Sequence, residues 1–310
     1  MRKVAVFYNP LSGSRHGRRL EDVKAVVDVL REAGVAATVT PTVALQGTAE
    51  LVKEAIEQDC DTVFACGGDG TVHDVLQSLV GSDVALGIIP LGTANALAHD
   101  LRIPLTPTAA ARAALTAERR RIAVGRASYQ DFSGVRGSRY FTVTLGIGAD
   151  AHLFYELESS LKISFGMMAY YFKATWLWLT LDLPAFAAEF SDERGQEVQY
   201  ELSELLAVRI RNFGGVLREL APGAGLDRND LRVVLFRTRS RIKYLRYVLR
   251  GLVGARWQVG GIELRHCSQV KCMALGDSPV YVEADGELLG TLPAEIDMVP
   301  DALTVLAPRR

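Results

Sequence analysis

This chain has few cysteines, no long apolar run and almost no net charge. The four cysteines form no Cys-x-x-Cys pair and no His/Cys cluster with zinc spacing, so we expect reduced thiols in a cytoplasmic protein. No stretch reaches the ~18 uninterrupted apolar residues of a membrane span, and the apolar run at the N-terminus is too short for a signal peptide. The formal net charge of −1 argues against a nucleic-acid binder.

Composition and pattern indicate two domains of different classes. The chain has 310 residues, of which 49% are hydrophobic and 23% charged, which suits about two globular domains with a sizeable core in each. As far as residue 125, short apolar strands alternate with amphipathic helices, which predicts an α/β domain with a parallel sheet over 1–125. Residues 126–294 hold short strand-like runs separated by turns and are expected to form an all-β sandwich. The tail, 295–310, is a candidate to complete the first domain.

The junction and the interior of the second domain carry further local signals. Arg121–Val124 and Arg126–Tyr129 are expected to be two separate strands, and Arg119-Arg120-Arg121 the solvated end of the preceding helix. Two helical segments interrupt the predicted sandwich. One is aromatic-rich, over 161–181, and the other is basic, over Arg241–Leu252.

The most informative stretch is Gly67-Gly68-Asp69-Gly70-Thr71, which follows the apolar run Thr62–Ala65. Such a run is typical of a buried parallel strand, and an amphipathic helix is expected from Val72. Glycine tolerates a positive φ and lets a backbone approach a ligand closely, while the free N–H groups of a helix N-terminus favour an anion. The stretch therefore predicts a phosphate cradle with one carboxylate in it. The alternative is a plain glycine turn between strand and helix.

Three glycine- or proline-containing turns follow apolar strands in the first domain, at residues 9–13, 67–71 and 90–95. Because the carboxyl ends of parallel strands share one edge of a sheet, and open α/β sheets bind ligands there, we expect these turns to converge. Each turn carries hydrogen-bonding side chains: Asn9 and Ser12, Asp69 and Thr71, Thr93 and Asn95. The convergence predicts a nucleotide site.

These turns resemble the N-P-x-S-G, G-G-D-G-T and P-x-G-T-x-N series of the diacylglycerol kinase catalytic-domain family. That family includes bacterial diacylglycerol and related lipid kinases, with eukaryotic sphingosine and ceramide kinases. The resemblance continues beyond the first domain and covers nearly the whole chain, through Gly146-Ile147-Gly148-Ala149-Asp150, Asn212-Phe213-Gly214-Gly215, Ala221-Pro222 and Asp285-Gly286-Glu287. It implies an N-terminal nucleotide domain and a C-terminal β-sandwich for a lipid substrate.

The resemblance also implies roles for individual residues in the first domain. The phosphates of ATP would be held by Gly67, Gly68, Gly70 and Thr71. The nucleotide site would be completed by Asn9, Thr40, Gly92, Thr93 and Asn95, with Asn95 supporting its loop. Thr38 and Thr42 are alternatives to Thr40. Asp69 would act through Mg²⁺ or as a base.

In the second domain, Glu287 matches the glutamate proposed as proton acceptor in bacterial members, with Asp285 beside it. The alternative for Asp285-Gly286 is a hairpin turn, since Asp-Gly is a strong hairpin signal. The sequence departs from the family after Ala221-Pro222, where Arg228 stands at the position of a magnesium-associated aspartate. Asp227 or Asp230 could replace that aspartate as metal ligands; otherwise the secondary metal is lost.

The lipid has two candidate points of contact. Phe165–Leu179 resembles the family segment where lipid is expected to approach, and its alternative is a helix packed on the sandwich. The segment Arg239–Trp257 interleaves arginines and a lysine with aliphatic residues and holds no Asp or Glu. Such a pattern is typical of a peripheral membrane element, and its alternative is a solvated charged face. The pairing of two chains into a homodimer is left open.

The resemblance thus implies an ATP- and Mg²⁺-dependent kinase of a lipid hydroxyl, with diacylglycerol as the lead substrate and a role in phospholipid biosynthesis. Phosphoryl transfer needs positioning, charge neutralisation and a carboxylate for the proton of the attacking hydroxyl, all of which the motifs can provide. One alternative is an NAD-kinase-like enzyme with a soluble substrate. Another is a non-catalytic regulator that binds lipid or nucleotide, which the altered run around Arg228 keeps open.

Overall fold

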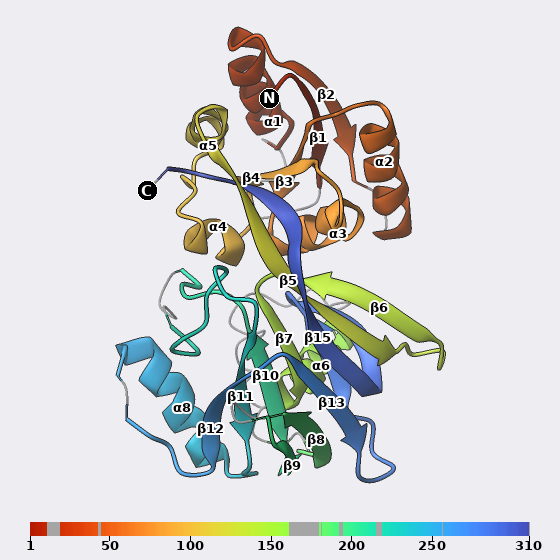
Figure 1. The fold of residues 1–310 in the computed structure, drawn as a ribbon, viewed down its shortest axis with the longest axis vertical. Coiled ribbons are helices and arrows are strands. Elements are labelled where there is room, and N and C mark those ends of the chain that lie inside the picture. Colours follow the sequence, from red (N-terminus) through yellow and green to blue (C-terminus); the bar gives the residue numbers. More distant parts are fainter. Residues whose placement is uncertain are drawn as a thin grey trace. The chain divides into compact units, whose positions relative to one another are not determined.

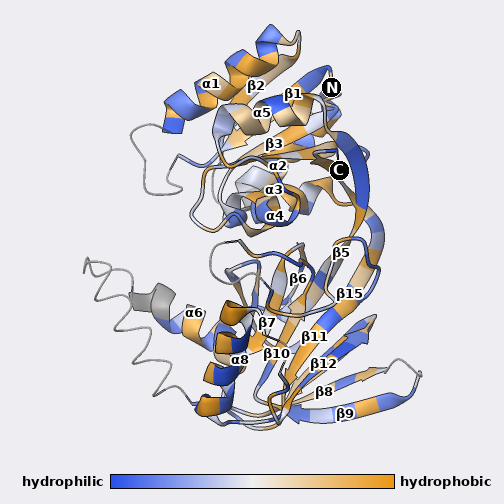
Figure 2. Cartoon of the chain, turned by 90° about the vertical axis from the view of Figure 1, so that its left-hand side faces the viewer, coloured by the Kyte–Doolittle hydropathy of each residue, from blue (hydrophilic) through white to orange (hydrophobic). Residues whose placement is uncertain are grey.

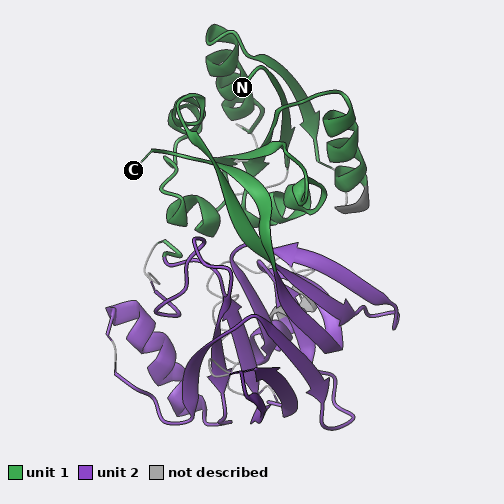
Figure 3. Cartoon of the chain, in the orientation of Figure 1, with its two compact units in different colours: residues 1–124, 212–217, 299–310 green, residues 125–211, 218–298 purple. Residues whose placement is uncertain are grey.

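A computed structural model describes residues 1–10, 19–42, 45–160, 180, 182–191, 195–214, 219–255 and 257–309. The chain divides into two compact units (Figure 3). Unit 1 comprises Met1–Val124, Asn212–Leu217 and Val299–Arg310, and unit 2 comprises Gly125–Arg211 and Arg218–Met298. Leu11–Gly13 of the first turn, Gly215 and the aromatic-rich segment 161–179 lie outside the described residues. No helix among the described residues is long and apolar enough to cross a membrane.

Unit 1 is an α/β layer structure built on a parallel sheet (Figure 1). Its strand order is β15-β4-β3-β1-β2, and all the neighbouring pairs in it are parallel. The strands are β1 (Lys3–Tyr8), β2 (Ala36–Pro41), β3 (Thr62–Gly67), β4 (Ala85–Pro90) and the last part of β15 (Glu287–Ala307). The helices are α1 (Arg19–Glu32), α2 (Leu45–Glu57), α3 (Asp69–Leu79), α4 (Ala96–Asp100) and α5 (Pro107–Leu115).

The burial of the strands follows their hydropathy. Every residue of β3 and β4 is buried, as continuous apolar runs of central parallel strands require, whereas β2 is largely exposed. Helix α1 buries Val23, Val26 and Leu30, which recur at helical spacing. The predicted N-terminal α/β domain with a parallel sheet is therefore confirmed.

Unit 2 is built from antiparallel strand pairs. Its strands are β5 (Glu118–Gln130), β6 (Arg136–Phe141), β7 (Thr144–Gly148), β8 (Phe186–Ser191), β9 (Glu197–Leu202), β10 (Glu204–Val208), β11 (Leu231–Phe236), β12 (Ile262–Cys267), β13 (Gln269–Ala274), β14 (Tyr281–Ala284) and the first part of β15. Its described helices are α6 (Ala149–Ser160) and α8 (Arg241–Val253). One branch of strands runs β12-β11-β10-β7-β14-β15, and another runs β9-β8-β13-β15.

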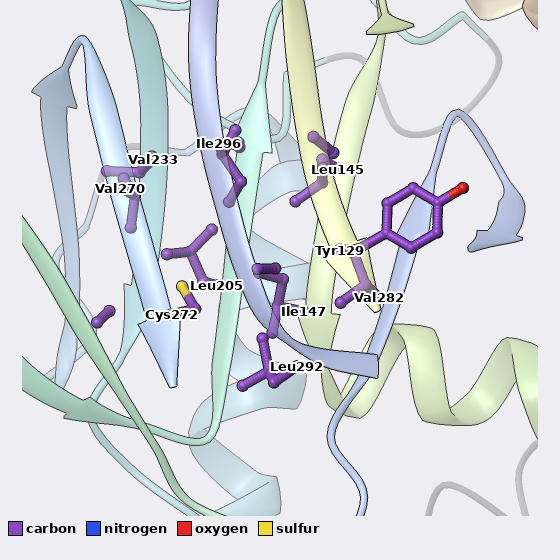
Figure 4. Packing of buried hydrophobic residues seen from close by; sticks show 14 of the residues in the cluster. Tyr129, Leu145, Ile147, Leu205, Val233, Val270, Cys272, Val282, Leu292 and Ile296 are labelled. Carbon is purple, nitrogen blue, oxygen red and sulfur yellow. The ribbon is translucent and has the colours of Figure 1, made fainter. Parts of the chain in front are cut away.

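A single apolar cluster receives side chains from both branches (Figure 4). Leu205 and Ile147 come from the first branch, and Val270 and Cys272 from the second, all with no exposed surface. Because both branches bury the same cluster, they enclose it between two layers, as in a sandwich. The predicted β-rich C-terminal domain is confirmed.

One prediction at the junction is wrong. The strands expected at Arg121–Val124 and Arg126–Tyr129 are one continuous strand, β5. The three arginines at 119–121 belong to this strand and do not end a helix. The guanidinium of Arg119 donates to the carbonyls of Asp61 and Asp83, and that of Arg121 donates to the carbonyl of Ser82 at 2.8 Å. Gly125 lies inside this continuous strand, and a Cβ there would overlap the ring of Phe141. The glycine is a packing requirement inside a strand.

Candidate active site

The turn from β3 to α3 leaves backbone donors available at a helix N-terminus. Gly68 is the N-cap in an extended conformation, with φ −91°, and provides no capping side chain. The first described intrahelical bond runs from the N–H of Val72 to the carbonyl of Gly68 at 3.2 Å. The amides of the first turn of a helix have no intrahelical partner and carry its positive dipole end. This geometry suits an anion such as a phosphate.

The glycines of this turn and of the turn after β4 serve close packing. None of Gly67, Gly68, Gly70 and Gly92 is among the residues of positive φ. A Cβ on Gly67 would overlap the side chain of Thr71, and a Cβ on Gly68 would lie 3.2 Å from the Cα of Gly92. The two turns therefore touch through bare backbone, which only glycine permits at this separation.

Thr71 sits in the first turn of α3 with only 4% of its surface exposed. Its Oγ1 has no hydrogen-bond partner among the described residues. A buried hydroxyl without a partner costs about 1–3 kcal/mol, so such a group in a native site calls for an explanation. An oxygen of a bound phosphate would supply that partner, and the residues present therefore fit the predicted triphosphate.

Asn95 stabilises the turn between β4 and α4. Its Oδ1 accepts the N–H of Gly92 at 2.9 Å, and its Nδ2 donates to the carbonyl of the same glycine at 2.9 Å. Asn95 adopts a left-handed conformation, φ 51°, and is the N-cap of the short helix α4. The N–H of Leu91 donates to the carbonyl of Gly67 at 2.8 Å, which ties the two turns together, while Thr93 is exposed. The amide of Asn95 thus shapes the loop.

The remaining predicted nucleotide residues lie at the same sheet edge. Asn9 follows β1, and its N–H donates to the carbonyl of Cys66 at 3.3 Å. Thr40 is near the end of β2, opposite Phe7 of β1. The hydroxyl of Thr38 donates to the carbonyl of Val4 at 3.3 Å within the sheet, which makes it less suited than Thr40 to a ligand. The carboxyl ends of β2, β1, β3 and β4 are consecutive in the sheet, so these positions share one edge.

A segment from the middle of the sequence also joins unit 1. The N–H of Asn212 donates to Oδ1 of Asp100 at 3.0 Å, and a Cβ on Gly214 would overlap the ring of His99. Gly214 has a positive φ of 77°. The motif at 212–214 therefore packs on α4, directly after the loop that Asn95 shapes. The motif at 212–214 is part of the resemblance to the family, but its packing on α4 could not be predicted from the sequence.

In unit 2, Asp285 and Glu287 belong to a tight hairpin between β14 and β15. Asp285 and Gly286 both have a positive φ, 52° and 86°, as a two-residue Asp-Gly hairpin turn requires. The carboxylate of Asp285 is buried and accepts the N–H groups of Thr142, Val143 and Thr144 at 2.8–3.0 Å. The carboxylate of Asp285 therefore holds the backbone of residues 142–144 against the hairpin. Glu287, by contrast, is exposed at the start of β15.

The run where the family carries a secondary metal is held by arginines in this chain. Asp227 accepts two bonds from Arg211 at 2.6 and 2.8 Å, and Asp230 accepts two bonds from Arg228, both at 2.6 Å. Burial raises the pKa of Asp230, but its bond to Arg228 and the nearby His266 outweigh burial and lower the pKa overall. Both carboxylates are thus neutralised by guanidinium groups.

The residues present do not fit a metal at Asp227 and Asp230. No group of three or more His, Cys, Asp or Glu residues with metal-site geometry occurs in the described part of the chain. Oxygen-rich ligand sets are what Mg²⁺ requires, and an arginine at the position of the family's aspartate supplies a fixed cation in its place. The pairing of both carboxylates with arginines favours the alternative reading, a chain without this secondary metal, and the metal at Asp227 and Asp230 stays a prediction.

Three carboxyl groups inside unit 2, of which two are buried and that of Asp150 is half-buried, were not anticipated from the sequence. Glu283 of β14, Asp150 at the start of α6 and Glu204 of β10 interact electrostatically inside unit 2. Burial raises the pKa of Asp150 to about 6, and burial together with Asp150 raises the pKa of Glu204 and of Glu283 well above its usual range. Glu283 Oε2 also accepts the N–H of Gly286 at 2.9 Å, which links this cluster to the hairpin of Glu287.

Comparison with known proteins identifies the family. The diacylglycerol kinase catalytic domain matches residues 3–127, and the YegS C-terminal NAD kinase beta sandwich-like domain matches residues 144–307. The chain is 30% identical over 318 residues to a protein of Mycobacterium tuberculosis named diacylglycerol kinase, covering 99% of this chain and 96% of that protein. The chain belongs to the diacylglycerol kinase catalytic-domain family. The resemblance stated from its motifs is confirmed.

Further proteins named as diacylglycerol kinases, and solved structures, are similar to this chain over its whole length. A Bacillus subtilis protein named diacylglycerol kinase is 26% identical over 312 residues, covering 100% of this chain and 97% of that one. A crystal structure of a putative diacylglycerol kinase from Bacillus anthracis covers 99% of this chain and 97% of its own with a TM-score of 0.75 at 19% identity. A yeast NADH kinase structure shares the fold more distantly, with a TM-score of 0.52 at 12% identity, covering 100% of this chain and 84% of its own. The protein is a kinase of the lipid-kinase family.

Proposed function

We propose that this kinase transfers the γ-phosphoryl group of ATP to the hydroxyl of diacylglycerol or a similar lipid alcohol, with Mg²⁺ as cofactor. The observation that carries the nucleotide part is the buried, partnerless hydroxyl of Thr71 in the first turn of α3, next to the contact of Gly68 with Gly92. A buried hydroxyl beside the N-terminus of a helix, whose first amides have no intrahelical partner, is suited to phosphate oxygens. The names of the curated relatives support the lipid part.

In this scheme Gly67, Gly68, Gly70 and Thr71 surround the phosphates with backbone and hydroxyl donors. Asn9, Thr40, Gly92 and Thr93 complete the nucleotide site from neighbouring strand ends, and Asn95 holds the loop of Gly92 in shape. When bound, Mg²⁺ supplies neutralisation of the charge on the transferring phosphoryl group. Asp69, in the first turn of α3, is the residue of unit 1 that we assign to this ion.

Glu287 is assigned as the proton acceptor. It takes the proton of the lipid hydroxyl while that oxygen forms a bond to the γ-phosphorus. The bond from the γ-phosphorus to the bridging oxygen breaks, and ADP leaves. Its exposed position at the end of a rigid hairpin suits a group that must reach a substrate. Asp285, whose oxygens bind three backbone N–H groups, is assigned to positioning that hairpin and not to proton transfer.

A kinase of a membrane-embedded alcohol must work at a bilayer surface. We therefore propose a cytoplasmic protein that associates peripherally with membranes, and the basic segment Arg239–Trp257 is our candidate element for this association. The chemistry of diacylglycerol phosphorylation places the product in phospholipid metabolism. Pairing of two chains stays a prediction that light scattering of the purified protein decides.

The deciding experiment is transfer of labelled γ-phosphate from ATP to a panel of lipid alcohols in mixed micelles. We expect label in phosphatidic acid with diacylglycerol as acceptor, dependence on Mg²⁺, and a loss of turnover of about 10²–10⁴-fold in Glu287→Gln, the range of a lost general base. A folded Asp69→Asn variant should lose turnover as well.

Two alternatives are tested by the same assay. The likeness to the yeast NADH kinase structure keeps an NAD-kinase-like activity in consideration. Label in NAD in the absence of lipid would favour that activity. ATP binding with no transfer to any acceptor would favour a regulator without turnover, for which the arginine-filled loop at Asp227 and Asp230 is the structural argument.

A further inference from the structure

Helix α8 packs on unit 2 through aromatic residues and not through its aliphatic residues. Tyr244, Tyr247 and Gly251 are buried. The rings of Tyr244 and Tyr247 lie 4.5 and 5.3 Å from the ring of Phe236 on β11. The hydroxyl of Tyr247 donates to the carbonyl of Leu220 at 2.7 Å, and the hydroxyl of Tyr244 is 2.8 Å from that of Ser203. These contacts fix which side of the helix faces the sheet.

The aliphatic residues of α8 point the other way. At 100° per residue, the aliphatic residues are centred on the side of the helix away from Tyr244, Tyr247 and Gly251, with Val248 at the edge nearest to Tyr244. Its exposed fractions are large: Ile242 73%, Leu245 57%, Val248 44%, Leu249 47%, Leu252 41% and Val253 59%. We call these six residues the aliphatic face. The hydropathy colouring of Figure 2 shows apolar segments along α8.

This orientation is the reverse of that of an ordinary surface helix, which buries its aliphatic stripe and presents its polar side to water. Single exposed leucines need no explanation, but a contiguous apolar patch marks a binding surface. The buried tyrosines show that the orientation is fixed by specific contacts. The aliphatic face is therefore a rigidly held apolar surface that is suited to bind an apolar partner.

Cations border this face. Arg246 is exposed, Lys243 is half-buried, and neither pairs with a carboxylate among the residues that the structure describes. The helix itself contains no Asp or Glu. Arg250 is different, because it is buried and stacks on Tyr247 with 4.2 Å from its guanidinium carbon to the ring centre. The surroundings of the aliphatic face thus carry positive charge.

We propose that the aliphatic face of α8 inserts into the interface of an anionic bilayer, with Lys243 and Arg246 at the level of the headgroups. Apolar residues at the acyl boundary and cations beside anionic headgroups are what an interfacial helix requires. The inference deepens the proposed function, since it names the partner of the segment that would bring the kinase to its lipid substrate. The docking itself does not depend on kinase activity.

A second copy of the chain fits this face less well. In a symmetric contact of α8 on α8, each Lys243 and Arg246 would approach the same cations of the other copy, and like charges disfavour such a contact. An anionic bilayer offers the complementary charge over a wide area. Coverage of the face by a second copy, or by residues 161–179 of the same chain, is an alternative that the experiment below detects.

The experiment uses the full chain and flotation with vesicles of phosphatidylcholine, alone or with about 30% phosphatidylglycerol. The unaltered protein should float with the anionic vesicles. Leu245→Asn combined with Leu249→Asn should lower the bound fraction at least about tenfold, and Lys243→Gln with Arg246→Gln should lower binding only to the anionic vesicles. The matched control is Leu20→Asn with Leu105→Asn, since both leucines are 50% exposed in unit 1. That control should bind as the unaltered protein does.

A fluorescence measurement locates the contact. Cys60, Cys66, Cys267 and Cys272 are buried, so a surface cysteine can be labelled selectively. An environment-sensitive dye on Leu249→Cys should shift to the blue when anionic vesicles are added, while the same dye on Leu20→Cys should not. Both variants change an exposed leucine and are expected to fold, which their melting temperatures verify.

Three outcomes would overturn the proposal. They are failure of the unaltered protein to bind anionic vesicles, equal binding by the Leu245/Leu249 variant, and a change from dimer to monomer in that variant with vesicle binding intact. The last outcome would assign the face to self-association. Failure of the kinase proposal is separable: a protein that floats with vesicles but transfers no phosphate retains the docking surface. A protein that phosphorylates micellar lipid but does not bind vesicles would contradict the docking surface and leave the kinase proposal intact.

Discussion

Asp285 and Glu287 are two residues apart, yet their carboxyl groups have different surroundings. Asp285 is buried against three backbone N–H groups, whereas Glu287 is exposed. The sequence motif treats them as one acidic pair, because spacing alone carries no information on burial. The structure separates a buried group that holds the hairpin from an exposed group that a substrate can reach.

This difference predicts opposite mutational signatures. Asp285→Ala leaves the N–H groups of Thr142, Val143 and Thr144 without an acceptor and should lower the free energy of unfolding by about 2–4 kcal/mol. Glu287→Gln should change that free energy by less than about 0.5 kcal/mol, as surface substitutions do, while removing turnover. Urea unfolding of both variants with the phosphate-transfer assay checks this. Equal stability losses in the two variants would contradict the assignment.

The glycine turns show what sequence reasoning can and cannot provide at the residue scale. The motifs marked Gly67, Gly68 and Gly92 for a phosphate site, and none of the three has a positive φ. Gly68 and Gly92 instead bring two turns from distant parts of the sequence into contact, while Gly67 leaves room for the side chain of Thr71. A long-range contact of this kind leaves no local signal.

At the scale of elements, strand and helix existence follows from hydropathy, but orientation does not. The parallel strands β3 and β4 and the helices between them are where the apolar runs predict them. By contrast, β5 runs through a glycine that local rules treat as a break, and the aliphatic side of α8 faces outward. Both depend on partners that are distant in sequence, Phe141 and Phe236 respectively.

The buried carboxyl cluster joins three elements, α6, β10 and β14, and it predicts a pH dependence of stability. Asp150 has a pKa raised from 3.8 to about 6 by burial, with Glu204 and Glu283 facing it and Tyr244 beside Glu204. The unfolded chain releases this proton near pH 3.8 and the folded chain near pH 6. The folded state thus binds more protons between these values, and stability falls as pH rises through this window.

Asp150→Asn removes this titration. Relative to the variant, the unaltered protein should lose on the order of 3 kcal/mol of stability between about pH 4 and pH 7, since each pKa unit corresponds to about 1.4 kcal/mol. Thermal unfolding of both proteins over this pH range measures the difference. Parallel curves would show that the carboxyl group of Asp150 titrates normally in the folded protein.

At the scale of the whole molecule, the two units divide the proposed chemistry. Every residue assigned to the nucleotide lies in unit 1, and the proposed proton acceptor Glu287 lies in unit 2. The sequence order hides part of this division, because residues 212–217 and 299–310 return to unit 1. The motif at Asn212 and the pairing of Thr304 with Ala85 in β4 are long-range contacts that the hydropathy pattern does not encode.

Binding and transfer should therefore be separable by mutation. Mg·ATP at about 100 times its dissociation constant adds about 2.7 kcal/mol to the stability of a protein that binds it only when folded. We expect this stabilisation in the unaltered protein and in Glu287→Gln alike, although only the former turns over. Gly92→Ala should abolish it, since the added Cβ would overlap Gly68 at the contact between the two turns.

The control is Gly276→Ala, because a Cβ at Gly276 meets nothing within 4 Å and that glycine has no positive φ. It should be stabilised by Mg·ATP as fully as the unaltered chain. Thermal shifts with and without nucleotide, read beside the transfer assay, measure all four proteins under one set of conditions. If Glu287→Gln lost the nucleotide-dependent shift, or Gly92→Ala kept it, the triphosphate would not be bound by the turns of unit 1 independently of the acid in unit 2.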